Sequence, residues 1–175
     1  QSGFTNIFNN AEYPITITNL LLQGKPLESI KGLVRFTINS TIGLLGILDP
    51  ASGMGIEAED EDFAQTLGVW GVDQGSYIMT PLLGPYTVRH GFGDLVDNLF
   101  NPISYIDNGV SRYGLKIIDK IQERSDLSSL EDELYGSYDP YQYLRDSYLQ
   151  NRTYKINNGV IDDVDEFDEI DFEDF

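Results

Sequence analysis

A series of apolar segments between Arg35 and Asp97, cut repeatedly by glycine and proline, constrains this chain more than any other feature. The stretch from Thr37 to Leu48 contains no charged side chain, yet polar residues interrupt it and two glycines weaken it as a helix. A single helix that crosses a bilayer needs about 20 apolar residues, and this stretch is far shorter. We therefore expect it to lie in a membrane or against a membrane protein rather than to cross alone.

The charge of the chain excludes several classes of partner. Its 175 residues are the usual length of one domain, and its net charge is −18. Residues 162–175 alone hold nine acidic and no basic residues. Nucleic acid is excluded as a partner, because phosphate binding depends on Lys and Arg. A polybasic surface that seeks anionic lipids is excluded for the same reason.

The sequence lacks the residues that most enzyme and metal sites require. It contains no cysteine and one histidine, His90, so disulfides and Cys/His zinc sites are excluded. No Gly-x-Ser-x-Gly motif or Walker loop is present, and Gly91-Phe92-Gly93 lacks the third glycine of a dinucleotide site. The acidic tail lacks the glycine and the closing glutamate of a calcium loop. We predict a protein that is not an enzyme and has no cofactor and no metal.

Proline and glycine set the expected helix boundaries in the first quarter of the chain. Two helical pieces are expected around Pro14, with a stop signal at Gly24-Lys25-Pro26. A second helix is expected from Leu27 into the uncharged stretch. It should end at Asp49-Pro50, because the residue before a proline avoids the helical region. Gln1 begins without the charged and apolar regions of a signal peptide, so we expect a segment upstream of it.

The following segments alternate between loops and short helices. Residues 51–62 should form an acidic loop, and Asp60 or Asp62 should cap a short helix that runs through Leu67. Residues 68–85 contain several glycines and prolines and should be extended or looped.

Helical periodicity returns in the second half of the chain. Apolar residues recur every three or four positions from Ile103 to Ile121 and predict an amphipathic helix. A last helix should run from Pro140 to about Arg152, with Asp139 as its cap. Residues 1–160 then form one domain, and residues 161–175 form a disordered acidic tail, because like charges repel and little apolar mass is available. That tail is either a solvated extension or a segment that docks on a basic surface.

Asp94 and Asp97 lie three residues apart, close to Arg89, and allow two interpretations. The first is a helix N-terminus, where acids interact favourably with the helix dipole and with the arginine. The second is a polar lining inside an apolar channel, since charges are costly in lipid and face a bundle interior or a water-filled cavity. Spacing alone favours the first interpretation.

The aromatic residues have two interpretations as well. They belong either to an ordinary core or to a belt at a membrane interface, where amphipathic rings prefer the headgroup level. The sequence does not decide between the two for Trp70, Tyr77, Tyr86, Tyr105 and Tyr113.

Several blocks of the sequence together resemble the MlaA/VacJ lipoproteins, in order and at matching spacings over about residues 3–160. The blocks are LLQGK (21–25), RFTINSTIGLLGILDPA (35–51), FAQTLGVWGVDQGSYIMTPLLGP (63–85), Val88-Arg89, GDLVD (93–97) and DPYQYLRDSYLQNR (139–152). The family's amino-terminal segment with its lipid-bearing cysteine has no counterpart here. Residues 103–136, where members have a hairpin and the edge of the channel, follow the family only loosely.

The resemblance implies a fold and a function. The fold is mainly α: a ring-like bundle of amphipathic helices embedded in one membrane leaflet, with glycine- and proline-rich loops and room for a short hairpin. The function is intermembrane phospholipid transport at the inner leaflet of the Gram-negative outer membrane. The implied partners are phospholipid, a trimeric outer-membrane porin and a periplasmic lipid carrier. The alternatives are a soluble module that binds an apolar ligand and a structural envelope protein.

Two sets of site residues follow. The predicted channel-lining residues are Arg89, Asp94, Asp97 and Arg112. The predicted membrane or porin contacts are Ile42, Gly43, Leu44, Leu45, Gly46 and Leu48. The small glycines in the second set would allow a close approach between helices.

Overall fold

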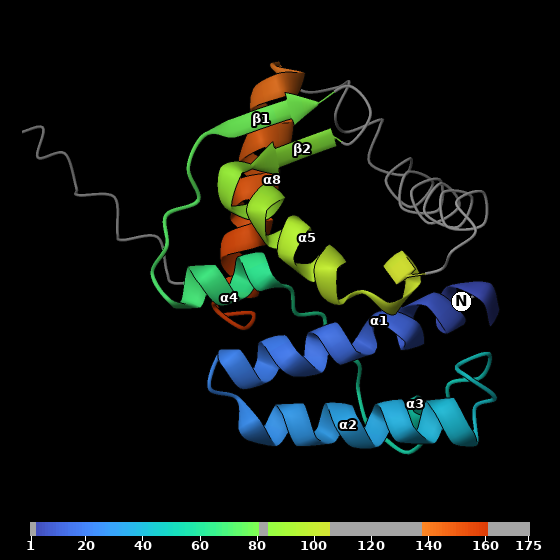
Figure 1. The fold of residues 1–175 in the computed structure, drawn as a ribbon. Helices are drawn as coiled ribbons and strands as arrows, with labels where there is room; N and C mark the ends of the chain where they lie inside the picture. Colours follow the sequence, from blue (N-terminus) through green and yellow to red (C-terminus); the bar gives the residue numbers. More distant parts are fainter. Residues whose placement is uncertain (1–2, 81–83, 106–137, 161–175) are drawn as a thin grey trace, which may run out of the picture.

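The computed structural model describes residues 3–80, 84–105 and 138–160, and these are mainly α-helical, as expected (Figure 1). The helices are α1 (Gly3–Leu22), α2 (Pro26–Thr41), α3 (Pro50–Gly53), α4 (Phe63–Val69), α5 (Val88–Phe100), the 3-10 helix η1 (Pro102–Tyr105) and α8 (Pro140–Ile156). Strands β1 (Tyr77–Thr80) and β2 (Gly84–Thr87) form an antiparallel pair in which Tyr77 faces Thr87. This pair lies in the segment that was expected to be extended or looped.

α1 and α2 pack side by side as a helical hairpin (Figure 1). The expected break of α1 at Pro14 is wrong, because the helix continues through this residue. A proline inside a helix costs about 3 kcal/mol or more, and packing along α2 offsets this cost. Gly32 of α2 allows the close approach, since an added Cβ would lie 3.2 Å from the Ile17 side chain and 3.4 Å from the Tyr13 ring.

α2 ends at Thr41, well before the expected stop at Asp49-Pro50. The next seven residues, 42–48, form a turn that we call the leucine turn. Leu44, Leu45 and Gly46 have left-handed φ angles of 55°, 61° and 95°, which a right-handed helix cannot include. The turn leads to Asp49, whose side chain accepts a hydrogen bond from the Ser52 backbone N–H and caps α3.

Short helices around the centre of the molecule begin where the capping residues predict. Asp62 accepts the Gln65 N–H at 2.7 Å and caps α4, which confirms one of the two expected caps. α5 packs on α4 through Gly93, where an added Cβ would lie 2.5 Å from the Ala64 backbone nitrogen. Thr87, the last residue of β2, caps α5 by accepting the His90 N–H at 3.3 Å.

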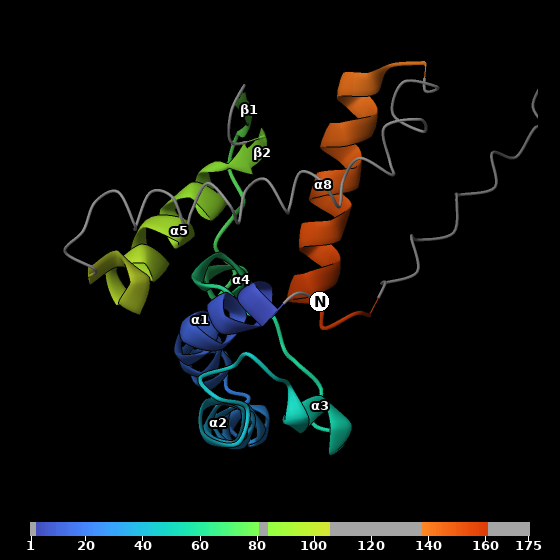
Figure 2. The same cartoon turned by 90° about the vertical axis from the view of Figure 1, so that its right-hand side faces the viewer.

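α8 begins at the expected cap, Asp139, and extends to Ile156, four residues beyond the expected Arg152. It contacts α4 and β2. Figure 2 shows α2 nearly end-on with α1 beside it, α4 on the other side of α1, and α5 and α8 on opposite sides of α4. The predicted amphipathic helix from Ile103 to Ile121 and the acidic tail lie outside the described residues, apart from η1 at the start of the former.

Candidate functional site

Among the described residues, the few buried side chains are mostly polar, while many large apolar side chains are exposed. Among the described residues, the buried apolar side chains are Tyr13, Leu20, Ala51 and Ala64. The buried polar and charged residues are far more numerous: Asn10, Asn19, Ser29, Arg35, Asn39, Glu61, Gln65, Thr66, Thr87, Asn101 and Arg152. This distribution reverses the usual one, in which large apolar residues supply most of the buried interior.

Half of the exposed large apolar residues in the described part of the chain lie on three elements. Those of α2 are Leu27, Ile30, Leu33 and Val34, those of the leucine turn are Ile42, Leu44, Leu45, Ile47 and Leu48, and those of α5 are Val88, Phe92, Leu95, Leu99 and Phe100. On α5, residues 88, 92, 95 and 99 follow helical spacing and form one stripe. Exposed apolar surface on this scale is typical of a protein that contacts a membrane or another protein.

A buried ion pair holds α2 and α3 together. The Arg35 guanidinium lies 2.6 Å from an Asp49 carboxylate oxygen and also donates to the Ser52 hydroxyl at 3.1 Å and to the Ile56 carbonyl. Asn39 donates to Asp49 at 2.9 Å. Partial burial works to raise the Asp49 pKa, but the hydrogen bonds from Ser52, Asn39 and Arg35 outweigh it and lower the pKa to about 2.

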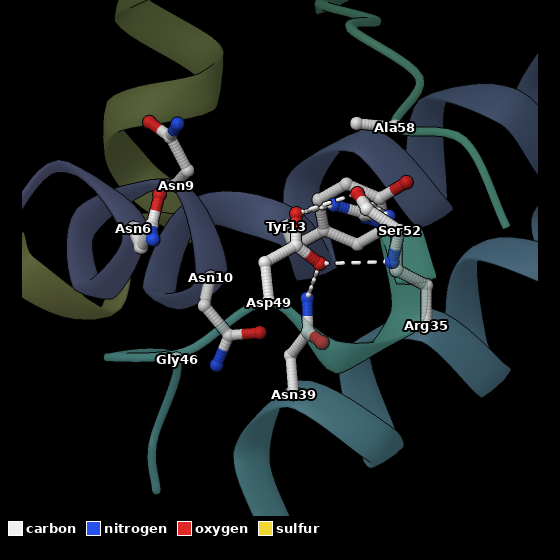
Figure 3. Close-up of a pocket in the computed structure, with 10 residues that line it drawn as sticks. All are labelled: Asn6, Asn9, Asn10, Tyr13, Arg35, Asn39, Gly46, Asp49, Ser52 and Ala58. Atoms are coloured by element: carbon white, nitrogen blue, oxygen red, sulfur yellow. Dashed lines mark hydrogen bonds and ion pairs between the residues drawn. The ribbon is translucent and has the colours of Figure 1, made fainter. Parts of the chain in front are cut away.

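A cavity of about 190 Å³ lies beside this ion pair, between α1, α2 and the leucine turn (Figure 3). Most of the residues that line it are polar: Asn6, Asn9, Asn10, Tyr13, Arg35, Asn39, Gly46, Asp49, Ser52 and Ala58. Because Asp49 neutralises Arg35, the two formal charges in the lining cancel. The cavity therefore suits water or a neutral polar group better than an acyl chain.

A second polar network joins α1, α4, α5 and α8. Arg152 of α8 makes a bidentate ion pair with Asp62, at 2.8 and 2.9 Å. Burial works against the charged form of Asp62, but the hydrogen bonds and charge of Arg152 lower its pKa below the ordinary value. Asp97 of α5 accepts the Phe63 N–H at 2.8 Å and the Asn19 side-chain amide at 3.2 Å. Burial raises the pKa of Asp97, and the carboxylates of Asp62 and Asp94 add to the shift.

The structure places three of the four predicted channel-lining residues on α5, and Arg112 lies outside the described residues. α5 begins at Val88, so Asp94 and Asp97 lie in its interior, and the expectation that they mark a helix N-terminus is wrong. Asp94 lies 3.4 Å from the His90 ring. Arg89 points elsewhere, because its guanidinium donates to the Val72 carbonyl at 2.7 Å. The predicted polar residues thus share a helix but not one cluster.

The structure divides the predicted membrane or porin contacts into two groups. Ile42, Leu44, Leu45 and Leu48 are exposed. Gly43 and Gly46 are buried, and Gly46 packs so tightly against Asn10 that an added Cβ would lie 2.4 Å from the Asn10 Cβ. The two glycines therefore pack within the molecule, and only the other four residues are accessible for contact with lipid or protein.

Sequence reasoning missed the polar network itself. The Arg35–Asp49 and Asp62–Arg152 pairs join residues 14 and 90 positions apart. Periodicity carries no signal for such pairs. The only available hint was that Asp49 and Asp62 each precede a helix, which predicts a cap but not an arginine partner.

The described residues contain neither a helix that is long and apolar enough to cross a membrane nor a group of His, Asp and Glu that could hold a metal ion.

Comparison with known proteins gives one consistent match. The family model described as MlaA lipoprotein matches residues 1–155. Proteins named intermembrane phospholipid transport system lipoprotein MlaA are 31% identical in Escherichia coli and 32% identical in Shigella flexneri, each over 92% of this chain and 65% of the relative. The Haemophilus influenzae protein of the same name is 32% identical over 92% of this chain and 66% of its own length.

A solved structure matches as well. It is described as the structural basis for maintenance of bacterial outer membrane lipid asymmetry, and it superimposes with a TM-score of 0.79 at 31% identity. The match covers 89% of this chain and 79% of that one. The chain itself spans only about 65% of the length of the curated relatives it matches.

Proposed function

The chain belongs to the MlaA lipoprotein family, and we propose that it removes mislocalised phospholipids from the outer leaflet of the outer membrane and passes them to a periplasmic carrier. The relatives that share 31–32% identity are named for intermembrane phospholipid transport, which supports this proposal. We propose that the protein works as a conduit and performs no covalent chemistry.

One observation carries the proposal: in the described residues most buried side chains are polar, whereas many large apolar side chains are exposed. Leucines and phenylalanines are exposed on α2, the leucine turn and α5. The free energy of the protein falls when acyl chains or an apolar protein wall cover these side chains. Buried hydrogen-bonded side chains then line the interior, where a lipid headgroup could pass. A soluble module for an apolar ligand is a poorer fit, since the cavity beside Arg35 has a polar lining.

We further propose that the helices form a ring in the inner leaflet and contact a trimeric porin. The exposed apolar stripe of α5 suits either lipid or a porin wall. Arg89, Asp94, Asp97 and Arg112 remain the proposed lining of the channel. Three of these residues lie on α5, and each makes a polar contact within the protein. Arg89 contacts Val72, Asp94 contacts His90, and Asp97 contacts Asn19 and Phe63. These contacts support a position of the three side chains away from lipid.

Deletion and complementation test this function. In a strain that lacks the gene, we expect more phospholipid in the outer leaflet, measured as the fraction that added phospholipase cleaves in intact cells. The full-length protein should restore the wild-type fraction. Asp94→Leu should restore it only in part, because the proposed lining loses a charge, whereas the exposed-site control Asp146→Leu should restore it fully. An unchanged fraction in the deletion strain would overturn the proposal.

A further inference from the structure

We propose that His90 sets how readily an anionic phospholipid headgroup passes compared with a zwitterionic one, because it holds the Asp94 carboxylate and neutralises it when protonated. The inference rests on the proposed function, in which Asp94 lines the channel, and it adds the residue that determines headgroup selectivity. His90 is the single histidine of the chain, so its effect can be measured without interference from another imidazole of this protein.

Aromatic side chains from neighbouring elements fix the His90 ring where β2 meets α5 and α8 (Figure 1). Tyr86 of β2 stacks on the ring, with centroids 4.7 Å apart and an angle of 18° between the planes. The Tyr148 hydroxyl of α8 lies 2.7 Å from Nδ1 of His90. Tyr148 packs edge-on against Tyr77 of β1, with centroids 5.9 Å apart. The imidazole therefore has a defined orientation on α5.

This orientation directs the second ring nitrogen, Nε2, at Asp94. Nε2 lies 3.4 Å from a carboxylate oxygen of Asp94, one turn further along α5. Burial raises the pKa of Tyr148, and the charge of Arg152 and hydrogen bonds from Thr87 oppose this shift. Because Thr87 donates to the Tyr148 oxygen, the Tyr148 hydroxyl proton is left for Nδ1 of His90. A neutral His90 then carries its proton on Nε2, and an imidazolium carries one on each nitrogen.

Protonation thus changes the charge of the pair without breaking it. In both states the Nε2–H of His90 donates to Asp94. With a neutral imidazole the pair carries one negative charge, and with an imidazolium it carries none. An imidazole changes its charge between about pH 5 and 8, within the range that a cell envelope meets.

A passing headgroup can reach this pair. The Asp94 side chain is 37% exposed and the His90 side chain is 20% exposed. The other two proposed lining residues on α5 contact groups that do not titrate: Arg89 donates to a backbone carbonyl, and Asp97 accepts from a backbone N–H and a side-chain amide. Among the described lining residues, Asp94 is thus the one whose direct polar partner titrates.

The other charged and titratable groups around His90 keep their charge near neutral pH. The tyrosines that pack on it from both strands and from α8 lose their protons only far above this range. Arg152 of α8 acts on Asp94 by its charge and makes a bidentate pair with Asp62. The hydrogen bonds and charge of Arg152 lower the pKa of Asp62, so that carboxylate stays ionised. His90 is therefore the group here whose charge responds to pH.

The charge of the pair acts differently on two classes of headgroup. A single negative charge repels an anionic headgroup such as that of phosphatidylglycerol, and it attracts the ammonium group of phosphatidylethanolamine. Protonation of His90 removes both effects. We expect a preference for zwitterionic lipid that weakens as the pH falls.

Transfer of two labelled lipids tests this selectivity. Full-length protein, purified with its porin, is placed in vesicles that contain phosphatidylethanolamine or phosphatidylglycerol with the same fluorescent acyl chain, and the periplasmic carrier is added outside at low ionic strength. The ratio of the two transfer rates is measured, each corrected for vesicles with porin alone. The wild-type ratio of phosphatidylethanolamine to phosphatidylglycerol should fall about threefold or more between pH ~7.5 and ~5.5.

Variants with a fixed charge separate this role from a structural one. His90→Gln is neutral at both pH values and should keep the high ratio at both. His90→Lys is positive at both and should keep the low ratio at both. Asp146→Asn, at an exposed pair on α8, is the control and should show the wild-type response to pH. A purely structural role of His90 would change both transfer rates alike and leave their ratio unchanged.

Nuclear magnetic resonance tests the pairing itself. With isotope-labelled histidine in this chain alone, the wild type gives one imidazole signal, whose pH midpoint can be followed. Asp94→Asn should lower this midpoint, because the carboxylate that favours the imidazolium is lost.

The inference is overturned if the wild-type ratio is the same at both pH values, if His90→Gln keeps the wild-type response, or if Asp94→Asn leaves the midpoint of His90 unchanged. In each of these cases, transfer faster than with porin alone would leave the proposed function standing. Transfer of both lipids no faster than with porin alone would remove the proposed function, and this inference with it.

Discussion

At the scale of single residues, the pairing of Arg35 with Asp49 decides whether α2 and α3 stay together. Arg35 is almost fully buried, and Asp49 lies 2.6 Å away. Removing one member of a buried pair leaves the other charge unpaired, which costs about 3–5 kcal/mol. Asn39 and Ser52 orient the carboxylate, so their hydrogen bonds add to the stability of the pair.

The low pKa of Asp49 sets the pH range in which this stability is lost. The folded-state pKa of about 2 is below the ordinary 3.8, so the carboxylate favours folding above pH ~4. This contribution should disappear as the pH falls from about 4 to about 2. Asp49→Asn should lower the free energy of unfolding at pH 7 by about 3–5 kcal/mol and should lack this acid-dependent loss.

Urea unfolding in one detergent at pH 7, 4 and 2 measures both effects. Asp146→Asn is the matched control, because Asp146 pairs with Arg145 at an exposed site and should contribute less than about 1 kcal/mol. The assignment fails if Asp49→Asn unfolds at the same urea concentration as the wild type.

At the scale of elements, two glycines in α5 have opposite roles. Gly93 faces α4, where an added Cβ would lie 2.5 Å from the Ala64 nitrogen, whereas an added Cβ at Gly91 would meet no atom within 4 Å. Gly93→Ala should therefore destabilise the protein by about 1–3 kcal/mol. Gly91→Ala should stabilise it by up to about 1 kcal/mol, because alanine favours the helix. Thermal unfolding of the two variants measures the contrast, and equal shifts would contradict the packing of α4 on α5.

The boundaries of elements were predictable where a local signal fixes them. Asp62 and Asp139 each cap the helix that follows. Asp139 was predicted, and Asp62 was one of the two residues expected to cap its helix. Pro14 gave the wrong boundary, because contacts with α2 outweigh its local preference. The end of α2 at Thr41 was missed for a related reason: Asn6 and Asn10 of α1 hold the leucine turn, and local sequence does not reveal them.

The candidate site was predictable only in part. The lack of charge from Thr37 to Leu48 indicated a surface for contact with a membrane or a protein, and four of the six predicted contact residues are exposed. A helix was expected there, so the turn itself was not predicted. The polar interior was not predicted, since its ion pairs join distant residues such as Asp62 and Arg152. Their side chains meet only after α8 has packed on α4.

At the scale of the whole molecule, the main feature is that the buried side chains of the described residues are mostly polar and that many large apolar side chains are exposed. The described residues bury few apolar side chains, so this part of the chain gains little stability from its own core in water. We propose that lipid or a porin supplies the missing contacts for α2, the leucine turn and α5. The same arrangement leaves a polar interior for a headgroup, which is what a phospholipid conduit needs.

Transfer of lipid in a reconstituted system tests this central claim most directly. Full-length protein, purified with its porin, is placed in vesicles that contain a fluorescent phospholipid, and the periplasmic carrier is added outside. We predict that the carrier acquires labelled phospholipid faster than from vesicles with porin alone, and that Asp94→Leu slows the transfer. Equal transfer rates with and without the protein would contradict the account.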